Sequence, residues 1–166
     1  GDENESIQWA EHYRAKGFSE KMLDTNNAYK YLLGYIQINH NSNYNIHQIC
    51  ASSAREINYF SNLSKSITFE ASDFTESVTK LMKKNYPQLN CYCVDITDER
   101  QISFIANRCN LIVAFGGLQY LLNHELKKFF DICFKQRCDI IISQPLDSTL
   151  NPYKLKNSVY RGGFSW

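Results

Sequence analysis

Five short apolar runs recur through the chain, separated by segments long enough for a helix. The runs span residues 46–50, 67–70, 91–95, 111–115 and 139–143. Between them, apolar residues recur at helical spacing, as at Phe74, Val78 and Leu81, and again at Leu122, Leu126, Phe129, Phe130 and Cys133. Strands that alternate with helices in this way predict an α/β fold with a mostly parallel sheet.

The segment before the first run is predicted to be helical. Ile7, Ala10 and Tyr13 share one helix face, and Gly17 is well placed to end that helix. A second helix is expected from about Thr25, with an apolar stripe of Ala28, Leu32, Tyr35 and Ile36. We therefore expect an N-terminal helical lid segment over 1–44 and the α/β core over 45–166, as one domain overall.

Composition narrows the function classes. With 18 Lys and Arg against 17 Asp and Glu, no net field draws the chain to nucleic acid or an anionic membrane. The six cysteines show no C-x-x-C spacing, so we expect reduced thiols and no metal or disulfide framework. No apolar run reaches the ~18 residues of a membrane-spanning helix, and the start GDENES is unlike a signal peptide. We expect a cytoplasmic protein.

The stretch NIHQICASSAR at 45–55 has the position of a nucleotide-binding strand-to-helix turn. Such a turn needs close backbone approach to the ligand, which glycine allows because it has no Cβ. Here the small residues Ala51, Ser52, Ser53 and Ala54 take that place. A nicotinamide-dependent enzyme is disfavoured, because its pyrophosphate normally needs G-x-G-x-x-G.

Taken in order along the chain, the segments of residues 45–147 resemble the class I S-adenosylmethionine-dependent methyltransferases. The first turn of that family usually reads E-L-G-x-G-x-G. Gln48 stands at the leading acid, and Cys50, Ser52 and Ala54 stand at the three glycines. The resemblance implies a Rossmann-like, doubly wound sheet with helices on both faces and S-adenosylmethionine as cofactor. It also implies contacts to the cofactor from Gln48, Cys50, Ala51 and Ser52.

The second and third strands carry acids in the family's positions. In ITFEASDFTES, Asp73, with Glu70 as rival, would accept hydrogen bonds from the ribose hydroxyls. The alternative is that Asp73 caps the next helix, with Glu76 completing a capping box. In NCYCVDITD, Asp95 would meet the adenine amino group beside Ile96. The alternative for Asp95 is an ordinary turn residue.

The fourth strand, in CNLIVAFGGLQYLL, is the strongest match, although Asn110 stands where the family has Asp. The resemblance places Phe115 and Gly116 at the cofactor and Gln119, Tyr120 and Tyr13 at the methyl acceptor. The alternative is that Gly116 and Gly117 only form the turn and that Tyr120 is core. The family's last two strands have no counterpart here, which predicts an exposed sheet edge in a truncated or minimal domain.

Two functions follow from the resemblance. The first is a methyltransferase acting on a small molecule, such as a sugar with its hydroxyl as acceptor, since the tail RGGFSW resembles a segment of sugar O-methyltransferases. His124 and His12 are weak candidates for a general base. The second is a catalytically inactive methyltransferase-like domain that serves as a binding or scaffolding module. Self-association and membership of a larger protein stay open, and no nucleic-acid or membrane partner is expected.

Overall fold

Five parallel strands form a single sheet in the computed structural model, which describes residues 3–143. The strands are β1 (Asn45–Gln48), β2 (Thr68–Asp73), β3 (Asn90–Cys93), β4 (Leu111–Phe115) and β5 (Asp139–Ser143). Their order in space is β3-β2-β1-β4-β5, with every neighbouring pair parallel. The chain therefore reverses its direction of winding between β1 and β4. That switch point is where open α/β sheets bind ligands.

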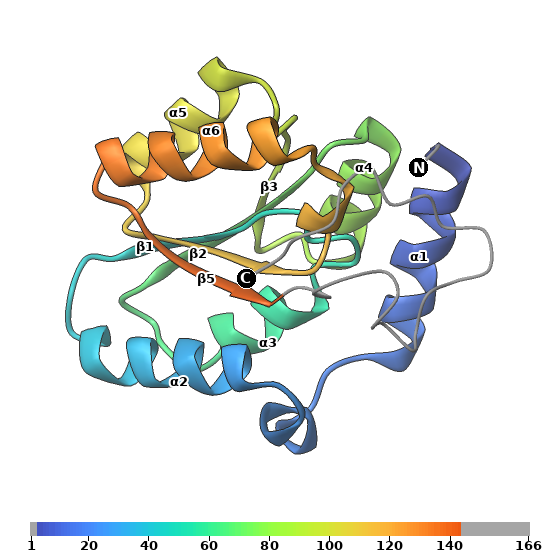
Figure 1. The fold of residues 1–166 in the computed structure, drawn as a ribbon. Coiled ribbons are helices and arrows are strands. Elements are labelled where there is room, and N and C mark those ends of the chain that lie inside the picture. Colours follow the sequence, from blue (N-terminus) through green and yellow to red (C-terminus); the bar gives the residue numbers. More distant parts are fainter. Residues whose placement is uncertain (1–2, 144–166) are drawn as a thin grey trace.

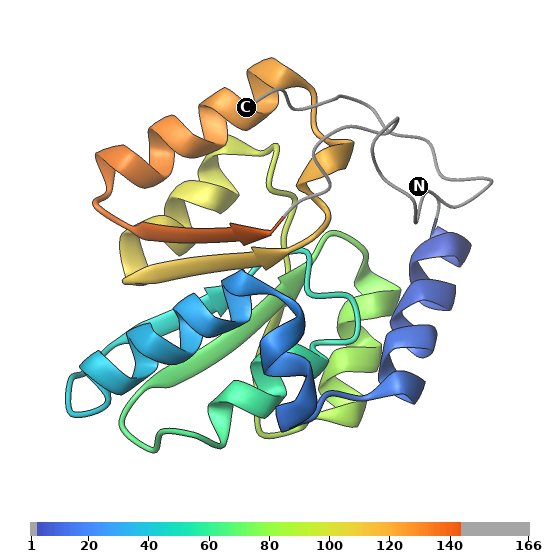
Figure 2. The ribbon, with the colours of Figure 1, turned by 60° about the horizontal axis from the view of Figure 1, so that its bottom comes forward.

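Helices cover both faces of the sheet (Figure 1). One face carries α5 (Glu99–Arg108) and α6 (Asn123–Lys135), and the other carries α2 (Asn27–Asn39), α3 (Arg55–Ser61) and α4 (Glu76–Asn85). Figure 2 shows α1 (Glu3–Lys16) beyond the carboxyl ends of the strands, next to α4. Two short 3-10 helices, η1 (Glu20–Thr25) and η2 (Leu118–Tyr120), complete the described elements. The predicted α/β, Rossmann-like fold is confirmed.

Each face of the sheet packs its own apolar core, because alternate residues of a strand point to opposite sides. On the side of α2, α3 and α4, the core includes Leu32, Ile46, Phe60, Phe69 and Val113. On the side of α5 and α6, it includes Ile102, Ile105, Ile112, Ala114 and Phe129. No helix among the described residues is both long and apolar enough to cross a membrane.

Local signals explain the ends of the first helices. Gly17 has φ 66°, and its N–H donates to the carbonyl of Tyr13 at 3.0 Å, so α1 ends where the glycine predicts. The helix α2 begins after Asn26, whose side chain accepts from the N–H of Ala28 at 2.9 Å. It starts two residues later than predicted, because 20–25 forms η1 instead.

The structure excludes one alternative and corrects one expectation about β2 and its helix. The residue that caps α4 is Thr75, whose hydroxyl accepts from the N–H of Val78 at 3.3 Å, so Asp73 is not the cap. Phe74 does not join the apolar stripe of that helix, since it is 53% exposed in the turn before it. Asp73 is instead the last residue of β2. The tail after 143, with RGGFSW, lies outside the described residues.

Candidate functional site

The turn after β1 follows an alternating left-handed path. Cys50, Ser52 and Ala54 have φ values of 51°, 54° and 60°. This region of backbone space is the one that glycine enters freely and other residues enter at a cost. The three residues are those that stand at the glycines of E-L-G-x-G-x-G. The turn thus has a backbone course suited to glycine although it contains no glycine.

A glycine in a second loop makes room for the first of these residues. Gly117 follows β4 with φ 98°, and a Cβ added to it would lie 2.5 Å from the Cβ of Cys50. The Cys50 side chain therefore occupies space that Gly117 leaves empty. Burial, and secondarily the charge of Asp73, raises the pKa of the Cys50 thiol, so the thiol stays protonated. The two loops at the switch point fit each other through this contact.

Asp73 ties this turn to the end of β2. It is 7% exposed. Its Oδ2 accepts from the N–H of Ser52 at 3.0 Å, and its Oδ1 accepts from the N–H of Phe74 at 2.9 Å. Burial raises the pKa of Asp73, and hydrogen bonds from the backbone of Ser52, Phe74 and Thr75 oppose the rise. A carboxylate has about four lone-pair positions, so Asp73 is able to accept one further hydrogen bond.

Gln48, at the position of the family's leading acid, is buried at the end of β1. Its Oε1 accepts from the N–H of Ile57 at 3.1 Å, and its Nε2 donates to Oε2 of Glu56 at 3.4 Å. Burial raises the pKa of Glu56, although Arg55 beside it acts in the opposite sense. Glu56, on α3, therefore places a carboxyl group against the side-chain amide of Gln48.

Arg55 connects this buried group to α1. Its guanidinium donates to the carbonyl of Gly17 at 2.7 Å and lies 4.8 Å from the ring centroid of Tyr13. Tyr13 in turn stacks on Trp9 at 5.3 Å. Tyr13, which was predicted to contact the methyl acceptor, thus lies at the carboxyl ends of the strands with its ring against Arg55.

The other predicted residues lie at strand ends but contact mainly their own loops. Asp95, which is exposed, accepts from the N–H and hydroxyl of Thr97 at 2.9 and 2.7 Å. Ile96 beside it is buried in the core under α5. Gln119 accepts from the N–H of Gly117 at 2.6 Å through its Oε1.

Phe115, at the end of β4, and Gly116 and Tyr120, which follow it, are half-buried. Ala51 is buried in the turn after β1. Both weak candidates for a general base are exposed: His12 lies on α1, and His124 lies in the first turn of α6. The structure brings the first turn, Asp73 and the β4 turn together.

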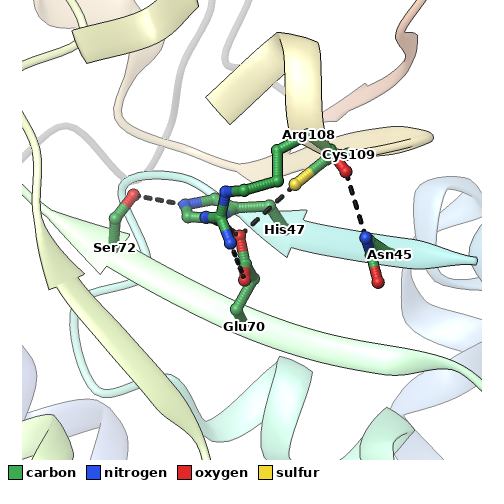
Figure 3. Close-up of polar contacts among 6 residues, drawn as sticks. All are labelled: Asn45, His47, Glu70, Ser72, Arg108 and Cys109. Carbon is green, nitrogen blue, oxygen red and sulfur yellow. Dashed lines mark hydrogen bonds and ion pairs between the residues drawn. The ribbon is translucent and has the colours of Figure 1, made fainter. Parts of the chain in front are cut away.

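A second polar group lies within the sheet, on the side of α5 (Figure 3). His47, fully buried, contacts Glu70 through Nδ1 at 2.7 Å and Ser72 through Nε2 at 2.7 Å. Both oxygens of Glu70 accept from Arg108, at 3.0 and 2.6 Å, and one also accepts from Cys109 at 3.3 Å. This cluster joins β1, β2 and the end of α5.

The charges in this cluster follow from burial. Burial lowers the pKa of His47, so the ring is neutral, with Nδ1–H donating to Glu70 and Nε2 accepting from Ser72. Burial alone would raise the pKa of Glu70, but hydrogen bonding from His47 and the charge of Arg108 outweigh it and lower that pKa. Glu70 is therefore ionised and paired, and it is not a rival to Asp73 for a ligand.

The order Ser72, His47, Glu70 has the hydrogen-bonding pattern of a hydrolase triad. Ser72 is 0% exposed, so no substrate reaches its hydroxyl. His47, Glu70 and Cys109 also place possible metal ligands within 4.8 Å of one another. Arg108 already occupies both Glu70 oxygens, and its charge disfavours a cation there. We interpret the cluster as structural.

The sequence offered a weak signal for this cluster. In β2, TFEASD, Glu70 and Ser72 alternate with the apolar Phe69 and Ala71. A strand covered on both faces is normally apolar throughout, so this alternation indicates a buried polar group with partners elsewhere. The pairing of His47 with Glu70 depends on the register of β1 against β2, which the sequence does not give.

The two hollows that stand out in the described part of the chain are elsewhere. One lies at the start of α5, lined by Asp98, Glu99, Arg100 and Ser103. The other lies at the end of α6, lined by Phe134, Lys135, Arg137, Cys138 and Asp139. Neither contains a residue of the turn after β1. The candidate site is therefore defined by its backbone and hydrogen bonds.

Solved structures resemble this fold at low sequence identity. DesVI of Streptomyces venezuelae aligns with a TM-score of 0.56 and 10% identity, over 72% of this chain and 50% of that one. The DszA carbon methyltransferase aligns with a TM-score of 0.52 and 13% identity, over 67% and 32%. Thermoplasma acidophilum 1320 gives 0.52 and 12%, over 87% and 69%. No family model matches the sequence, and no curated protein matches it significantly.

These similarities show a fold and no more. The chain has the Rossmann-like fold that methyltransferases share, as the similarity to DszA indicates. It spans half or less of the length of DesVI and DszA, at 50% and 32%. The activity and substrates of those whole proteins therefore do not transfer to it, because one fold supports many activities.

Proposed function

We propose that the chain is an S-adenosylmethionine-dependent methyltransferase domain that acts on a small molecule. The observation that carries the proposal is the left-handed course of Cys50, Ser52 and Ala54, at the glycine positions of a cofactor turn. Non-glycine residues keep such strained conformations only where the surroundings impose them, and they cluster at ligand sites. A domain that had lost its cofactor would have no evident need for this strain.

The residues around the turn fit the cofactor. Asp73 has a lone-pair position left for a ribose hydroxyl, and Asp95 with Ile96 would face the adenine. The cofactor would supply an electrophilic methyl group on a sulfonium. The protein would contribute orientation of the acceptor, from the side of Tyr13, Gln119 and Tyr120.

The finer proposal is a hydroxyl acceptor, such as that of a sugar. It rests on the tail segment RGGFSW and on the balanced charge, which favours neutral substrates over polyanions. His12 on α1 would serve as base if the acceptor lies between α1 and the sheet; His124 is the alternative. The inactive module remains the competing proposal, and the same experiment tests it.

The decisive experiment is calorimetric titration with S-adenosylmethionine and S-adenosylhomocysteine. We expect saturable binding to the unmodified chain and binding about 10- to 100-fold weaker to Asp73→Ala, because hydrogen bonds to a charged group are lost. Asp131→Ala is the matched control, since Asp131 is an exposed carboxylate on α6 paired only with Lys127 among the contacts observed. It should bind like the unmodified chain.

Two results would contradict the proposal in different ways. No heat with millimolar ligand would overturn the methyltransferase function and favour the inactive module. Equal binding to Asp73→Ala, with the variant shown to be folded by circular dichroism, would show that the protein binds the cofactor but does not use Asp73 to do so. Where binding is found, formation of S-adenosylhomocysteine with a panel of sugars tests the acceptor.

A further inference from the structure

The helix α1 (Glu3–Lys16) is held on the molecule by little apolar packing. Of its 14 residues, all within the described part of the chain, Ala10 alone is buried. The helix lies along α4, beyond the carboxyl ends of the strands (Figure 2). A helix of this length is marginal in water by itself. Its position on the sheet edge therefore depends on a small number of specific contacts.

One side chain from the core of the fold reaches the end of α1. Arg55, the first residue of α3, is buried, and its Nη1 donates to the carbonyl of Gly17 at 2.7 Å. The guanidinium carbon also lies 4.8 Å from the ring centroid of Tyr13, and that ring stacks on Trp9. The Nε of Arg55 contacts Glu56 at 3.4 Å. The shorter of its two side-chain hydrogen bonds is thus the one to the α1 end.

Arg55 is itself fixed at the candidate site. It follows Ala54, the last left-handed residue of the turn after β1, and its N–H donates to the Ser53 hydroxyl at 3.3 Å. A buried guanidinium needs hydrogen-bond partners, and here α1 supplies one of them. The side chain therefore joins the turn after β1 to a helix that has little other packing.

We infer that Arg55 is a positioning residue, which docks α1 at the carboxyl ends of the strands through Gly17 and Tyr13. The consequence for the reaction rests on the proposed function above. With α1 docked, Tyr13 and His12, whose ring meets that of Tyr13 edge-on, are held on the acceptor side of the site. The contacts of the Arg55 side chain are to α1 and Glu56, so cofactor binding at Asp73 should not depend on them.

Amide hydrogen exchange measures the docking of α1 directly, because an undocked helix loses its protection while the core keeps its own. Arg55→Met should lower the protection of the α1 amides about 10- to 100-fold, the loss expected for a hydrogen bond from a charged group. Arg55→Lys keeps the charge but not the planar guanidinium, and should lower it about three- to tenfold. Arg100→Met, at an exposed position on α5, is the matched control and should change nothing in α1.

A second variant approaches the same contact from α1. Tyr13→Leu removes the ring from Arg55 and keeps a good helix former, so the α1 protection should fall about three- to tenfold. In the Arg55→Met background the same substitution should lower it only about twofold, because the contact is already lost. A general loss of stability would not produce this coupling.

Calorimetry with S-adenosylhomocysteine separates the positioning of α1 from support of the cofactor turn. Arg55→Met should bind this ligand as the unmodified chain does, although its α1 is less protected. Unchanged α1 protection in Arg55→Met, or additive effects with Tyr13→Leu, would overturn the inference. An affinity that falls by the same factor as the protection would also overturn it and assign Arg55 to the turn. Failure of the unmodified chain to bind would overturn the proposed function alone, because exchange in α1 is measured without ligand.

Discussion

At the scale of single residues, the turn after β1 stands out for where it places strain. Each non-glycine residue in a left-handed conformation costs on the order of 1 kcal/mol relative to glycine. Cys50, Ser52 and Ala54 carry this cost within five positions of sequence. Part of this cost is offset at Cys50, because its side chain packs into the space that Gly117 leaves open by having no Cβ. The glycine of one loop and the cysteine of the other are thus interdependent.

That dependence predicts the effect of Gly117→Ala. The added Cβ would lie 2.5 Å from the Cβ of Cys50, on a backbone with φ 98°, so we expect a loss of about 3 kcal/mol of stability. In a Cys50→Gly background the clash is absent and only the backbone cost remains. The same substitution should then cost about 1–2 kcal/mol less. Urea denaturation of the four proteins measures this coupling.

Gly34→Ala provides the control for the same chemical change. Gly34 lies inside α2, and a Cβ there would meet nothing within 4 Å. Alanine should therefore stabilise the helix by about 1 kcal/mol. Strictly additive effects of Cys50→Gly and Gly117→Ala would show that the two loops do not depend on each other.

At the scale of elements, the buried cluster of His47, Glu70, Ser72, Arg108 and Cys109 joins β1, β2 and α5 where apolar residues would be usual. A buried ion pair seldom adds net stability, but removing one partner leaves an uncompensated charge. The cluster also carries a titratable group, His47, that is fully buried and neutral. This makes the packing of α5 on the sheet sensitive to pH.

The direction of the pH effect follows from the lowered pKa of His47. An unfolded histidine takes up a proton near its ordinary value of about 6.5, whereas the buried ring resists protonation. The unfolded chain therefore binds more protons below pH 6.5, and stability is lost as the pH falls. His47→Gln should remove this loss, which amounts to up to about 1 kcal/mol between pH 6.5 and 5.5.

Denaturation with urea at pH 7.5, 6.5 and 5.5 tests this for both proteins. Glu56 and Asp73, whose pKa values are raised by burial, act in the opposite sense, but they are present in both chains and cancel in the difference. His124→Gln, at an exposed position, is the control and should keep the slope of the unmodified chain. Parallel pH profiles for the unmodified chain and His47→Gln would contradict the assignment.

The same cluster marks the limit of what the sequence predicts. Apolar runs gave β4 at 111–115 and β5 at 139–143 with their observed bounds, because β4 is apolar throughout and β5 has an apolar centre, residues 140–142. The predicted run at 46–50 ends two residues after β1 does, since Ile49 and Cys50 already belong to the turn. Glu70 was considered only as a ligand contact. Its partners come from β1 and α5, and only the tertiary structure brings them together.

Among the candidate site residues, position in the fold was predictable and conformation was not. The motif of the resembled family aligned Cys50, Ser52 and Ala54 with glycines. The sequence did not predict a left-handed backbone at these three positions, because non-glycine residues normally avoid that conformation. Asp73 was open between cap and ligand contact. The cap is Thr75, because β2 extends to 73 and leaves Asp73 bonded to the first turn. Its role toward a ligand stays a prediction.

At the scale of the whole molecule, the fold is compatible with more than one class of cofactor. A parallel sheet with a switch point between β1 and β4 serves both nicotinamide enzymes and methyltransferases. The difference lies in the first turn, where a pyrophosphate needs several free amides. Here one of those amides, from Ser52, already donates to Asp73. The cofactor that binds is therefore determined by a few groups at the carboxyl ends of the strands, and not by the fold.

A preference for S-adenosylhomocysteine over NAD predicts how each ligand changes the free energy of unfolding. A ligand that binds only the folded chain adds RT ln(1 + [L]/Kd), or about 2.7 kcal/mol at a hundredfold excess over Kd. S-adenosylhomocysteine should raise the urea midpoint by the amount that its calorimetric Kd dictates. The slope of free energy against urea should stay constant, because binding does not change the surface exposed on unfolding. NAD at the same concentrations should leave the midpoint unchanged, since the turn offers its pyrophosphate too few free amides. A rise with NAD and none with S-adenosylhomocysteine would contradict the methyltransferase proposal and assign the edge to a dinucleotide.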